Sequence, residues 1–269
     1  MKLRVYCPAK VNLFLAVGPR DSRGYHPLRT IFQAVGLYDI LDVAFGSSGE
    51  TTVEIVGADL PENNTVTKAL RLSHEVFAIK PSHIRLEKHI PMQSGLGGGS
   101  SDAAGLLRAL NYVRAVPLQE IEAIASAVGA DVPFFLTGGR AKGKRYGDRI
   151  TPMEDAPVQW LVIAKPEVGC STVEMYSKLD ENEREGRDWP EGDLLYNDFE
   201  RVAPCECLDL IEKVLSLGAE DAALSGSGSC VFGRFKSQAA ADGAKARVGC
   251  QAWVVKTLTR TESLRIEEI

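Results

Sequence analysis

The stretch between residues 91 and 102 has the composition of a phosphate-binding loop. Four glycines in five residues are followed by two serines in the run Pro91-Met92-Gln93-Ser94-Gly95-Leu96-Gly97-Gly98-Gly99-Ser100-Ser101-Asp102. Glycine lets the backbone approach a ligand closely and adopt positive φ at little cost. An apolar-periodic helix is predicted from Ala103, so free N–H groups and a helix dipole would converge on one point. We therefore predict a phosphate site; the alternative is a flexible connector.

The familiar phosphate-loop patterns do not fit this chain. Gly138 to Lys144 matches the Walker A spacing, but Arg145 replaces the Ser or Thr that would hold Mg²⁺. In the dinucleotide pattern G-x-G-x-x-G, Ser100 stands where the third glycine belongs. Protein-kinase signatures are absent from the sequence. What remains is a loop whose N–H groups cradle phosphates, with Ser100 or Ser101 able to reach phosphate or Mg²⁺.

Two further residues could handle protons and charge. Asp131 precedes Val132-Pro133, so its carboxylate could accept a proton or could cap a helix. Lys10 is flanked by Ala9 and Val11 in a strand-like run, where a lysine is unusual. The plain alternative for Lys10 is an edge residue that extends its ammonium into water. The residues themselves leave both pairs of readings open.

The elements that must position these residues alternate between strand and helix patterns. Strands are predicted near residues 2–17, 31–43, 51–56, 84–90, 160–164, 230–235 and 253–258, and helices near 66–77, 103–113, 118–128, 203–217 and 237–248. Asp180–Asp193 is rich in charge and is predicted to be a solvated loop, and Ser225–Gly228 a second Gly/Ser turn. We predict an α+β protein of two domains, 1–154 and 155–269, divided between Pro152 and Pro157.

Composition and charge limit the partners. The chain of 269 residues is 45% hydrophobic and 25% charged, with a net charge of −5, which disfavours nucleic acid and acidic lipid as partners. Its six cysteines form no C-x-x-C pair and its histidines lack zinc spacing, so no protein metal centre is predicted. The sequence has no signal-peptide pattern and no membrane-length apolar run. We expect a cytoplasmic protein, a monomer or weak homodimer, with a small-molecule substrate.

Three segments in order carry a family resemblance. They are Pro8-Ala9-Lys10-Val11-Asn12-Leu13, the glycine loop Pro91–Asp102, and Leu224-Ser225-Gly226-Ser227-Gly228-Ser229. Together they resemble the three motifs of the GHMP kinases, the galacto-, homoserine, mevalonate and phosphomevalonate kinases. The resemblance implies an ATP-binding amino-terminal domain like the second domain of ribosomal protein S5, and a ferredoxin-like carboxy-terminal domain on the substrate side. It also implies ATP as phosphoryl donor, with Mg²⁺.

Three shorter segments resemble one branch of that family. They are Gly24-Tyr25-His26, Gly129-Ala130-Asp131-Val132-Pro133 and Asn197-Asp198-Phe199-Glu200. They are similar to segments of the members that phosphorylate the 2-hydroxyl of a cytidine-diphosphate-linked methylerythritol in the non-mevalonate route to isoprenoid precursors. The function implied is this ATP-dependent phosphorylation.

The resemblance assigns roles to the nucleotide side and to the reaction centre. Asp131 would accept the proton of the acceptor hydroxyl, and Lys10 would keep Asp131 ionised and lower the pKa of that hydroxyl. The glycine loop would bind the ATP phosphates. Lys88 and Asn64 would line the adenine, although both also fit ordinary surface residues.

Other residues are assigned to the acceptor. Tyr25 would stack on cytosine and His26 would hydrogen-bond the edge of the base, where the alternative for Tyr25 is a turn residue covering the core. Asn12 would bind the acceptor or orient Lys10, or is simply a polar residue at a strand end. Thr172 and Tyr176 match positions of the substrate pocket more weakly. Gly226, Ser227 and Gly228 would surround the diphosphate of the acceptor, and the alternative for them is a tight turn between helix and strand.

Two charged features fit structural roles better than functional ones. Asp102 is predicted to be an acidic residue in a first helical turn, favoured by the helix dipole, more than a metal ligand. A run of basic residues is predicted to be solvated: Arg140, Lys142, Lys144, Arg145 and Arg149.

Three rival functions stay open on the sequence. One is another GHMP kinase acting on mevalonate, phosphomevalonate or homoserine, which carry no base for Tyr25 to stack on. Another is a non-catalytic nucleotide-binding regulator. The third is an RNA-binding module, which the acidic balance disfavours.

Overall fold

Alternating strand and helix patterns form two sheets in the part of the chain that the structure, a computed structural model, describes: residues 1–46, 50–78, 80–181, 186–190 and 192–269. The first sheet contains β1 (Lys2–Val17), β2 (Leu28–Ala44), β3 (Thr52–Val56), β4 (His83–Glu87), β5 (Arg140–Lys144), β6 (Arg149–Pro152), β8 (Tyr196–Asn197) and β12 (Ile266–Glu268). The second sheet contains β7 (Trp160–Lys165), β9 (Asp221–Leu224), β10 (Val231–Phe235) and β11 (Gln251–Lys256). In strand order the first sheet runs β12-β1-β2-β4-β3, with β5 also on β2 and β8 on β1, and the second runs β11-β7-β10-β9.

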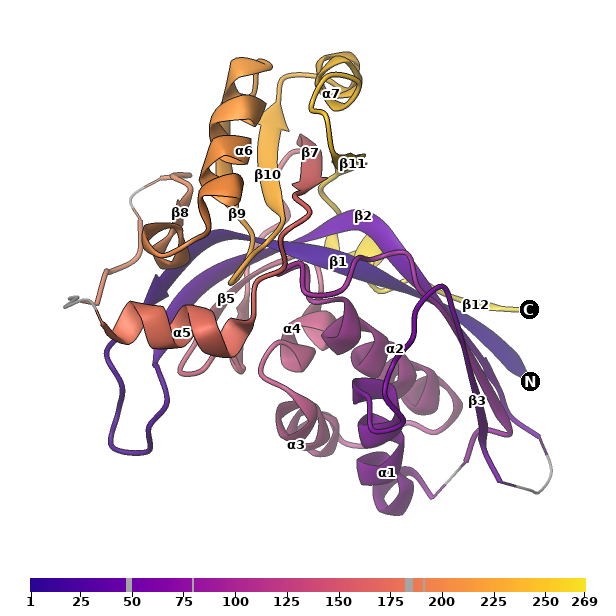
Figure 1. The fold of residues 1–269 in the computed structure, drawn as a ribbon. Coiled ribbons are helices and arrows are strands. Elements are labelled where there is room, and N and C mark those ends of the chain that lie inside the picture. The colour runs from indigo at the N-terminus through magenta and orange to yellow at the C-terminus, as the bar shows by residue number, and fades with distance from the viewer. Residues whose placement is uncertain (47–49, 79, 182–185, 191) are drawn as a thin grey trace.

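Helices cover both sheets. They are α1 (Thr65–Phe77), α2 (Gly98–Val113), α3 (Leu118–Val128), α4 (Val132–Thr137), α5 (Thr172–Asp180), α6 (Cys205–Ser216), α7 (Gln238–Lys245) and α8 (Arg260–Ser263), with a 3₁₀ segment η1 (Asp198–Arg201). Figure 1 shows α1–α4 against one face of the long strands β1 and β2, and α6 and α7 against the second sheet. The apolar residues between the two sheets form a separate core, so the order of layers is helices, sheet, sheet, helices.

The predicted α+β class is confirmed, and most predicted elements lie where their periodicity placed them. Helix α3 matches its predicted bounds, and α1 begins after Asn64, whose Oδ1 accepts from two backbone N–H groups of its first turn. The division near residue 154 stays a proposal. Residues 160–256 supply the second sheet, but α8 and β12 return to the first sheet beside β1.

The start of α2 differs from the prediction. The helix begins at Gly98, inside the glycine run, instead of at Ala103. Gly97 precedes it with φ of 73°, a left-handed conformation that favours glycine, and its carbonyl accepts from the N–H of Ser101 at 2.9 Å. The first turn carries only glycine and serine, so apolar periodicity could not reveal it. Asp102 therefore lies beyond the first turn, and its predicted dipole role is wrong.

An irregularity in β1 decides which way Lys10 faces. Before it, alternate residues of β1 such as Val5 and Cys7 belong to the core under α1–α4. The register with β2 shifts between Pro8 and Ala9, and after the shift Ala9 and Val11 belong to the core between the sheets. Lys10 thus faces the helices, together with Asn12.

The charged segment 180–193 is not a simple solvated loop. Its residues 182–185 and 191 lie outside the described part of the chain. Asp180 ends α5, and Asp193 pairs with both Arg140 of β5, at 2.8 Å, and Arg234 of β10. Lys142 and Lys144 lie over the ring of Trp189, so part of the basic run binds this segment as well.

Gly105 sets how closely α2 packs on β1. A Cβ at this position would overlap the Sγ atom of Cys7, whereas a Cβ on Gly243 of α7 would meet nothing within 4 Å. We predict that Gly105→Ala lowers the free energy of unfolding by about 1–3 kcal/mol through overpacking. The matched control Gly243→Ala should raise it by about 0.4–1 kcal/mol. Denaturant unfolding of both variants checks this, and equal effects of the two substitutions would contradict it.

Candidate active site

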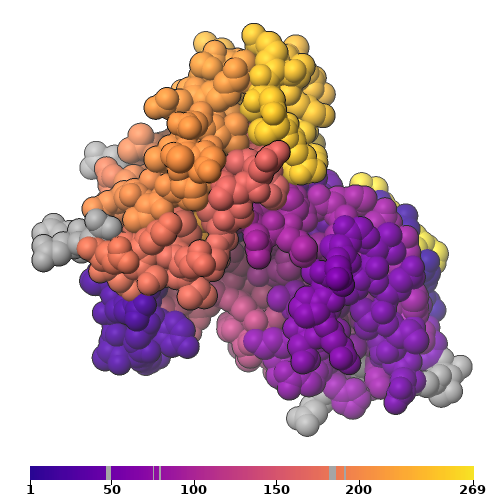
Figure 2. Space-filling view, in the orientation of Figure 1, coloured from indigo at the N-terminus to yellow at the C-terminus, as the bar shows by residue number. Residues whose placement is uncertain are grey.

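A cleft of about 820 Å³ lies where the glycine loop, the strands β1 and β2, and α5 meet. In Figure 2 the surface is hollowed between the α5 region and the helices α1 and α2. Most residues predicted to be functional line it: Lys10, Asn12, Asn64, Lys88, Pro91, Met92, Gln93, Ser94, Gly95, Gly97, Gly98, Gly99, Ser100, Asp131, Thr172, Tyr176, Gly226, Ser227 and Gly228. The structure therefore brings the segment around Lys10, the glycine loop and the second glycine turn to one cavity.

The glycine loop forms one wall of the cleft at the start of α2. Gly95 and Gly97 both have φ of 73°, and a Cβ on Gly97 would lie 2.9 Å from the ring of Phe135. The first N–H groups of α2 have no partner within the helix and open on the cleft where Gly98, Gly99 and Ser100 line it. The arrangement is a cradle for an anion.

Two predicted loop residues lie under the cradle. Leu96 and Ser101 are fully buried and do not line the cleft. The backbone of Leu96 is used instead, because its carbonyl accepts from the N–H of Lys10 at 2.9 Å. This bond fixes the cradle to strand β1.

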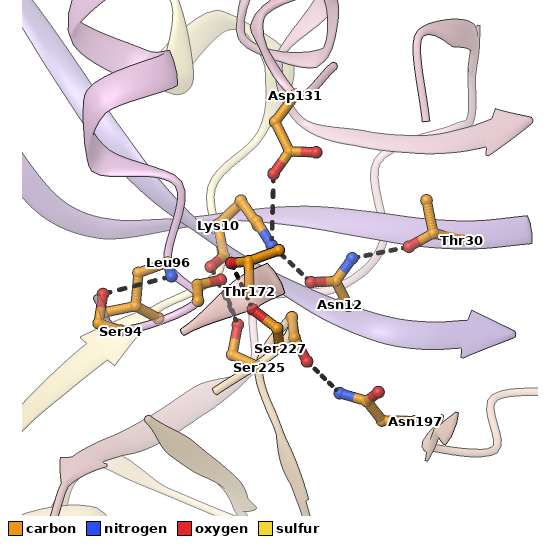
Figure 3. A network of polar contacts seen from close by, with 12 residues as sticks. Lys10, Asn12, Thr30, Ser94, Leu96, Asp131, Thr172, Asn197, Ser225 and Ser227 are labelled. Carbon is orange, nitrogen blue, oxygen red and sulfur yellow. Dashed lines mark hydrogen bonds and ion pairs between the residues drawn. The ribbon is translucent and has the colours of Figure 1, made fainter. Parts of the chain in front are cut away.

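Lys10 and Asp131 face each other beside the cradle, as Figure 3 shows. The ammonium of Lys10 lies 3.7 Å from Asp131 Oδ2 and donates to Asn12 Oδ1 at 2.6 Å. Asn12 in turn donates to Thr30 Oγ1 at 2.7 Å, which fixes the orientation of its amide. Asn12 thus holds the ammonium of Lys10, and its predicted role in orienting that group stays a prediction.

Burial and the neighbouring charge have opposite effects on the pKa of Lys10. Its side chain is 4% exposed, and burial lowers the pKa of the ammonium, while the charge of Asp131 opposes this effect. Asp131 occupies the cap position of α4, but its carboxylate makes no capping hydrogen bond. That carboxylate is about one third exposed and points to Lys10. The carboxylate of Asp131 therefore does not cap α4, and its role as proton acceptor stays a prediction.

A second lysine is held by two carboxylates behind the cradle. Lys88 Nζ donates to Asp102 Oδ2 at 2.6 Å and also bonds to Asp39 Oδ2. Asp39 Oδ1 accepts the backbone N–H groups of His89 and Ile90, which lead into the glycine loop. Because Lys88 is 5% exposed, the surface reading of this residue is wrong. The cluster fixes the loop entrance to α2.

The cluster carries two carboxylates for one ammonium. Burial and the neighbouring Asp39 raise the pKa of Asp102 well above its usual value, against the effect of Lys88. The two carboxylates raise the pKa of Lys88, although its burial acts in the other direction. Asp102 Oδ1 is buried without a hydrogen-bond partner. Its carboxyl group is therefore the one that burial drives toward the neutral form.

The opposite wall of the cleft combines hydroxyls and aromatic rings. Thr172 Oγ1 and Ser227 Oγ lie 2.9 Å apart where the start of α5 meets the second glycine turn. The ring of Tyr176 stacks on His26 at 5.0 Å and meets Phe199 edge-on at 4.9 Å. Hydroxyls thus lie next to a stack of flat rings.

Tyr25 and His26 do not line the cleft itself. Tyr25 is 62% exposed and its ring lies 5.3 Å from that of Tyr146, which does line it. His26 bonds through Nδ1 to the carbonyl of Gly18 at 2.9 Å, and its Nε2 lies 3.2 Å from Asp180. Since both ring nitrogens face protein groups, the ring edge predicted to read a base is already engaged.

Sequence patterns missed several residues of the cleft. Tyr146 lines it and bonds to Asp21 at 2.5 Å, and Asp39 holds Lys88, yet neither belongs to a recognisable motif. Phe199 lies in a noted motif that had no assigned role. The one available signal was the aromatic at 146 following a run of cations, which does not specify a site.

An anion cradle, a buried lysine–carboxylate pair and an aromatic wall in one cleft are the parts that a small-molecule phosphotransferase needs. The chain matches the family model "GHMP kinases N terminal domain" over residues 64–139 and "GHMP kinases C terminal" over residues 206–255. These matches include the glycine loop, Asp131 and the second glycine turn.

Curated relatives narrow the family. A 4-diphosphocytidyl-2-C-methyl-D-erythritol kinase of Solibacter usitatus is 35% identical over 253 residues, covering 86% of this chain and 80% of the relative. The enzyme of that name from Syntrophotalea carbinolica is 35% identical over 271 residues, covering 93% and 96%. The chain belongs to the GHMP kinases, in the family of the 4-diphosphocytidyl-2-C-methyl-D-erythritol kinases.

Solved structures agree with this family. A crystal structure of 4-(cytidine 5'-diphospho)-2C-methyl-D-erythritol kinase superposes with a TM-score of 0.80 at 32% identity, covering 94% of this chain and 98% of that one. Homoserine kinase from Cytophaga hutchinsonii has a TM-score of 0.74 at 18% identity, covering 99% and 97%, and shares the fold. The predicted two-domain GHMP kinase fold is confirmed. No helix among the described residues is long and apolar enough to cross a membrane.

Oxygen ligands suited to Mg²⁺ are few but present. No group of three or more His, Cys, Asp or Glu in the described chain could hold a metal. Mg²⁺ in kinases needs only one or two protein oxygens, because phosphates and water supply the rest. Ser94, Ser100, Asp102 and Asp131 are among the oxygen-bearing residues that line the cleft, and of these Ser100 and Asp131 would suit such an ion.

The buried carboxyl of Asp102 predicts a pH-dependent stability. Its folded pKa is raised, so the folded state holds a proton that the unfolded chain releases above about pH 4. Stability is then complete below the unfolded pKa and is lost as pH rises through the folded pKa. We expect Asp102→Asn to remove this loss, so that the free energy of unfolding of the variant increases relative to that of the wild type as pH rises.

Denaturant unfolding of both proteins from pH 4 to pH 8 measures the difference. Asp209→Asn, on the exposed side of α6, is the control for the loss of a carboxylate that is not buried. A constant difference between Asp102→Asn and the wild type across this range would contradict the prediction.

Proposed function

We propose that the protein transfers the γ-phosphoryl group of ATP to the 2-hydroxyl of 4-diphosphocytidyl-2-C-methyl-D-erythritol. The relatives named for this substrate cover most of the chain, and the cleft offers one site for each part of such a reaction. Mg²⁺ as the nucleotide's partner ion, a cytoplasmic location and a monomeric or weakly dimeric state belong to the same proposal.

The observation that carries the proposal is the position of the Lys10–Asp131 pair between two polar walls. On one side lies the glycine loop, where a Cβ on Gly97 would be 3.2 Å from Lys10 Cγ. On the other lies the second glycine turn, where a Cβ on Gly226 would be 3.1 Å from Lys10 Nζ. An acceptor hydroxyl at the pair would therefore lie between a phosphate donor in the cradle and its own diphosphate at the turn.

Phosphoryl transfer requires alignment, neutralised charge and a place for the hydroxyl proton. Asp131 accepts the proton of the acceptor hydroxyl. The oxygen of that hydroxyl attacks the γ-phosphorus, and the bond between the γ-phosphorus and the oxygen that bridges to the β-phosphate breaks. Lys10, held by Asn12, stays near both the hydroxyl and the transferred group, and its charge favours the developing alkoxide. N–H groups of the cradle stabilise the ADP that leaves, and Mg²⁺, when bound, neutralises phosphate charge.

The acceptor's base would meet the aromatic residues beside α5. Tyr25 is exposed on its turn and is positioned to stack, while Tyr176 lines the cleft and is held in place by rings on both sides. The backbone of the turn, more than the ring of His26, is left to hydrogen-bond the base edge, because the ring nitrogens already face Gly18 and Asp180. Mevalonate and homoserine carry no base for this wall.

Removing either member of the reacting pair should stop catalysis without unfolding the protein. Asp131→Ala loses the proton acceptor and Lys10→Ala loses the charge, so each should cut turnover by about 10²-fold or more. Steady-state phosphorylation measures this, with circular dichroism to confirm the fold. Lys142→Ala, a lysine over the ring of Trp189, is the control and should keep turnover. Near-normal turnover of both site variants would remove the mechanism.

Removing the exposed tyrosine should weaken acceptor binding alone. Stacking on an aromatic ring is worth about 1–3 kcal/mol per base, so Tyr25→Ala should raise the acceptor KM by about 5- to 150-fold and leave the ATP KM unchanged. Tyr112→Ala, at another exposed tyrosine, is the control. Turnover on mevalonate equal to that on the cytidine substrate, or an unchanged acceptor KM in Tyr25→Ala, would argue against this substrate.

A further inference from the structure

The segment Asn197–Glu200 reaches several parts of the cleft, although the mechanism above does not use it. Asp198 Oδ2 accepts the N–H of Val17, at the end of β1, at 2.7 Å. Phe199 meets the ring of Tyr176, and Glu200 Oε1 accepts the N–H of Leu224 at 2.8 Å. One short segment therefore contacts the strand that leads to the Tyr25 turn, the aromatic wall and strand β9.

Asn197 makes the contact closest to the reaction centre. Its Nδ2 donates to the carbonyls of Leu224 and Gly226, both at 2.8 Å, and its Oδ1 accepts the N–H of Phe199 at 3.0 Å. The residue is 3% exposed. Its amide is thus fully used, with both protons committed to the second glycine turn.

These bonds fix the direction of one peptide plane. In a trans peptide the C=O and N–H groups point in opposite directions. Because the carbonyl of Gly226 is turned toward Asn197, the N–H of Ser227 points away from it. In Figure 3 Ser227 lies between the side chains of Asn197 and Lys10. The N–H of Ser227 therefore points to the side of Lys10, which lines the cleft together with Ser227.

The N–H of Ser227 is available for a ligand. In the described chain it donates to no protein acceptor. It lies in the lining of the cleft, next to the paired hydroxyls of Ser227 and Thr172. An N–H donor beside two hydroxyls suits the oxygens of a diphosphate.

We propose that Asn197 is a positioning residue that holds the N–H of Ser227 toward the diphosphate of a cytidine-diphosphate ligand. This rests on the proposed function, since that function supplies the ligand. The same segment supports Tyr176 through Phe199, so it also sets the spacing between the base and the diphosphate. Asn197 itself touches no ligand, and acts through the turn.

The test compares the binding of CDP and cytidine, because their difference isolates the diphosphate. Asn197→Asp replaces the two donated protons by an oxygen that the carbonyls of Leu224 and Gly226 repel, which would rotate the peptide. Isothermal titration of the apoprotein should show the preference for CDP over cytidine falling by about tenfold. Cytidine affinity should stay within about twofold of the wild type.

Glu200→Ala is the matched control. It removes a hydrogen bond from the same segment to β9 but leaves the Gly226 carbonyl bonded to Asn197. Its thermal stability should fall while its CDP-to-cytidine preference stays that of the wild type. If Asn197→Asp does not fold, Asn197→Ser, which lacks the amide but adds no charge, is titrated in its place and is expected to lower the preference too.

Two results would overturn the proposal. An unchanged CDP-to-cytidine ratio in a folded Asn197 variant would show that the turn does not need its amide. Equal loss of CDP and cytidine affinity, shared with Glu200→Ala, would reduce the segment to general support of the fold. Failure of the wild type to bind either ligand would instead reject the proposed substrate, which keeps the two failures distinct.

Discussion

A buried ammonium that must stay paired is the constraint on which this site depends. Lys10 lies inside the protein, where an unpaired charge is costly, and Asn12 and Asp131 supply its partners. Strand β1 can aim Lys10 at them only because its register shifts between Pro8 and Ala9. Without that shift Lys10 would face the core between the sheets, whose described buried residues are apolar.

The two buried lysines differ in the carboxylates around them, and this difference distinguishes a structural role from a catalytic one. Lys88 has two buried carboxylates, and its pKa is raised; Lys10 has one partly exposed carboxylate, and its pKa is lowered. In the first cluster the ammonium of Lys88 is paired within the protein, and the cluster holds the glycine loop in place. The second leaves charge unsatisfied on the cleft side, where a transferring phosphoryl group would find it.

Sequence patterns predicted the fold class, most elements and the two glycine-rich segments that line the cleft, because glycine runs and periodicity are local signals. They could not predict the direction of Lys10, which depends on a register shift between β1 and β2 that no sequence pattern marks. They also missed α5, where few residues are buried, and the role of Asp39, whose ion pair with Lys88 joins residues 49 positions apart in the sequence. Asp102 was misassigned because the start of α2 has no apolar periodicity.

The glycine loop, on the phosphate-donor side of the cleft, is hydrogen-bonded through its backbone to the second glycine turn, on the acceptor side. The N–H of Cys230 donates to the carbonyl of Ser94 at 3.1 Å, and that of Ser229 to Gln93 at 3.3 Å. A Cβ on Gly95 would collide with the carbonyl of Ser225, so the loop and the turn are in direct contact. Because the two motifs touch without side chains between them, the spacing between the phosphate cradle and the acceptor turn is set by the backbone. Glycine is required at these contacts for packing as well as for binding phosphate.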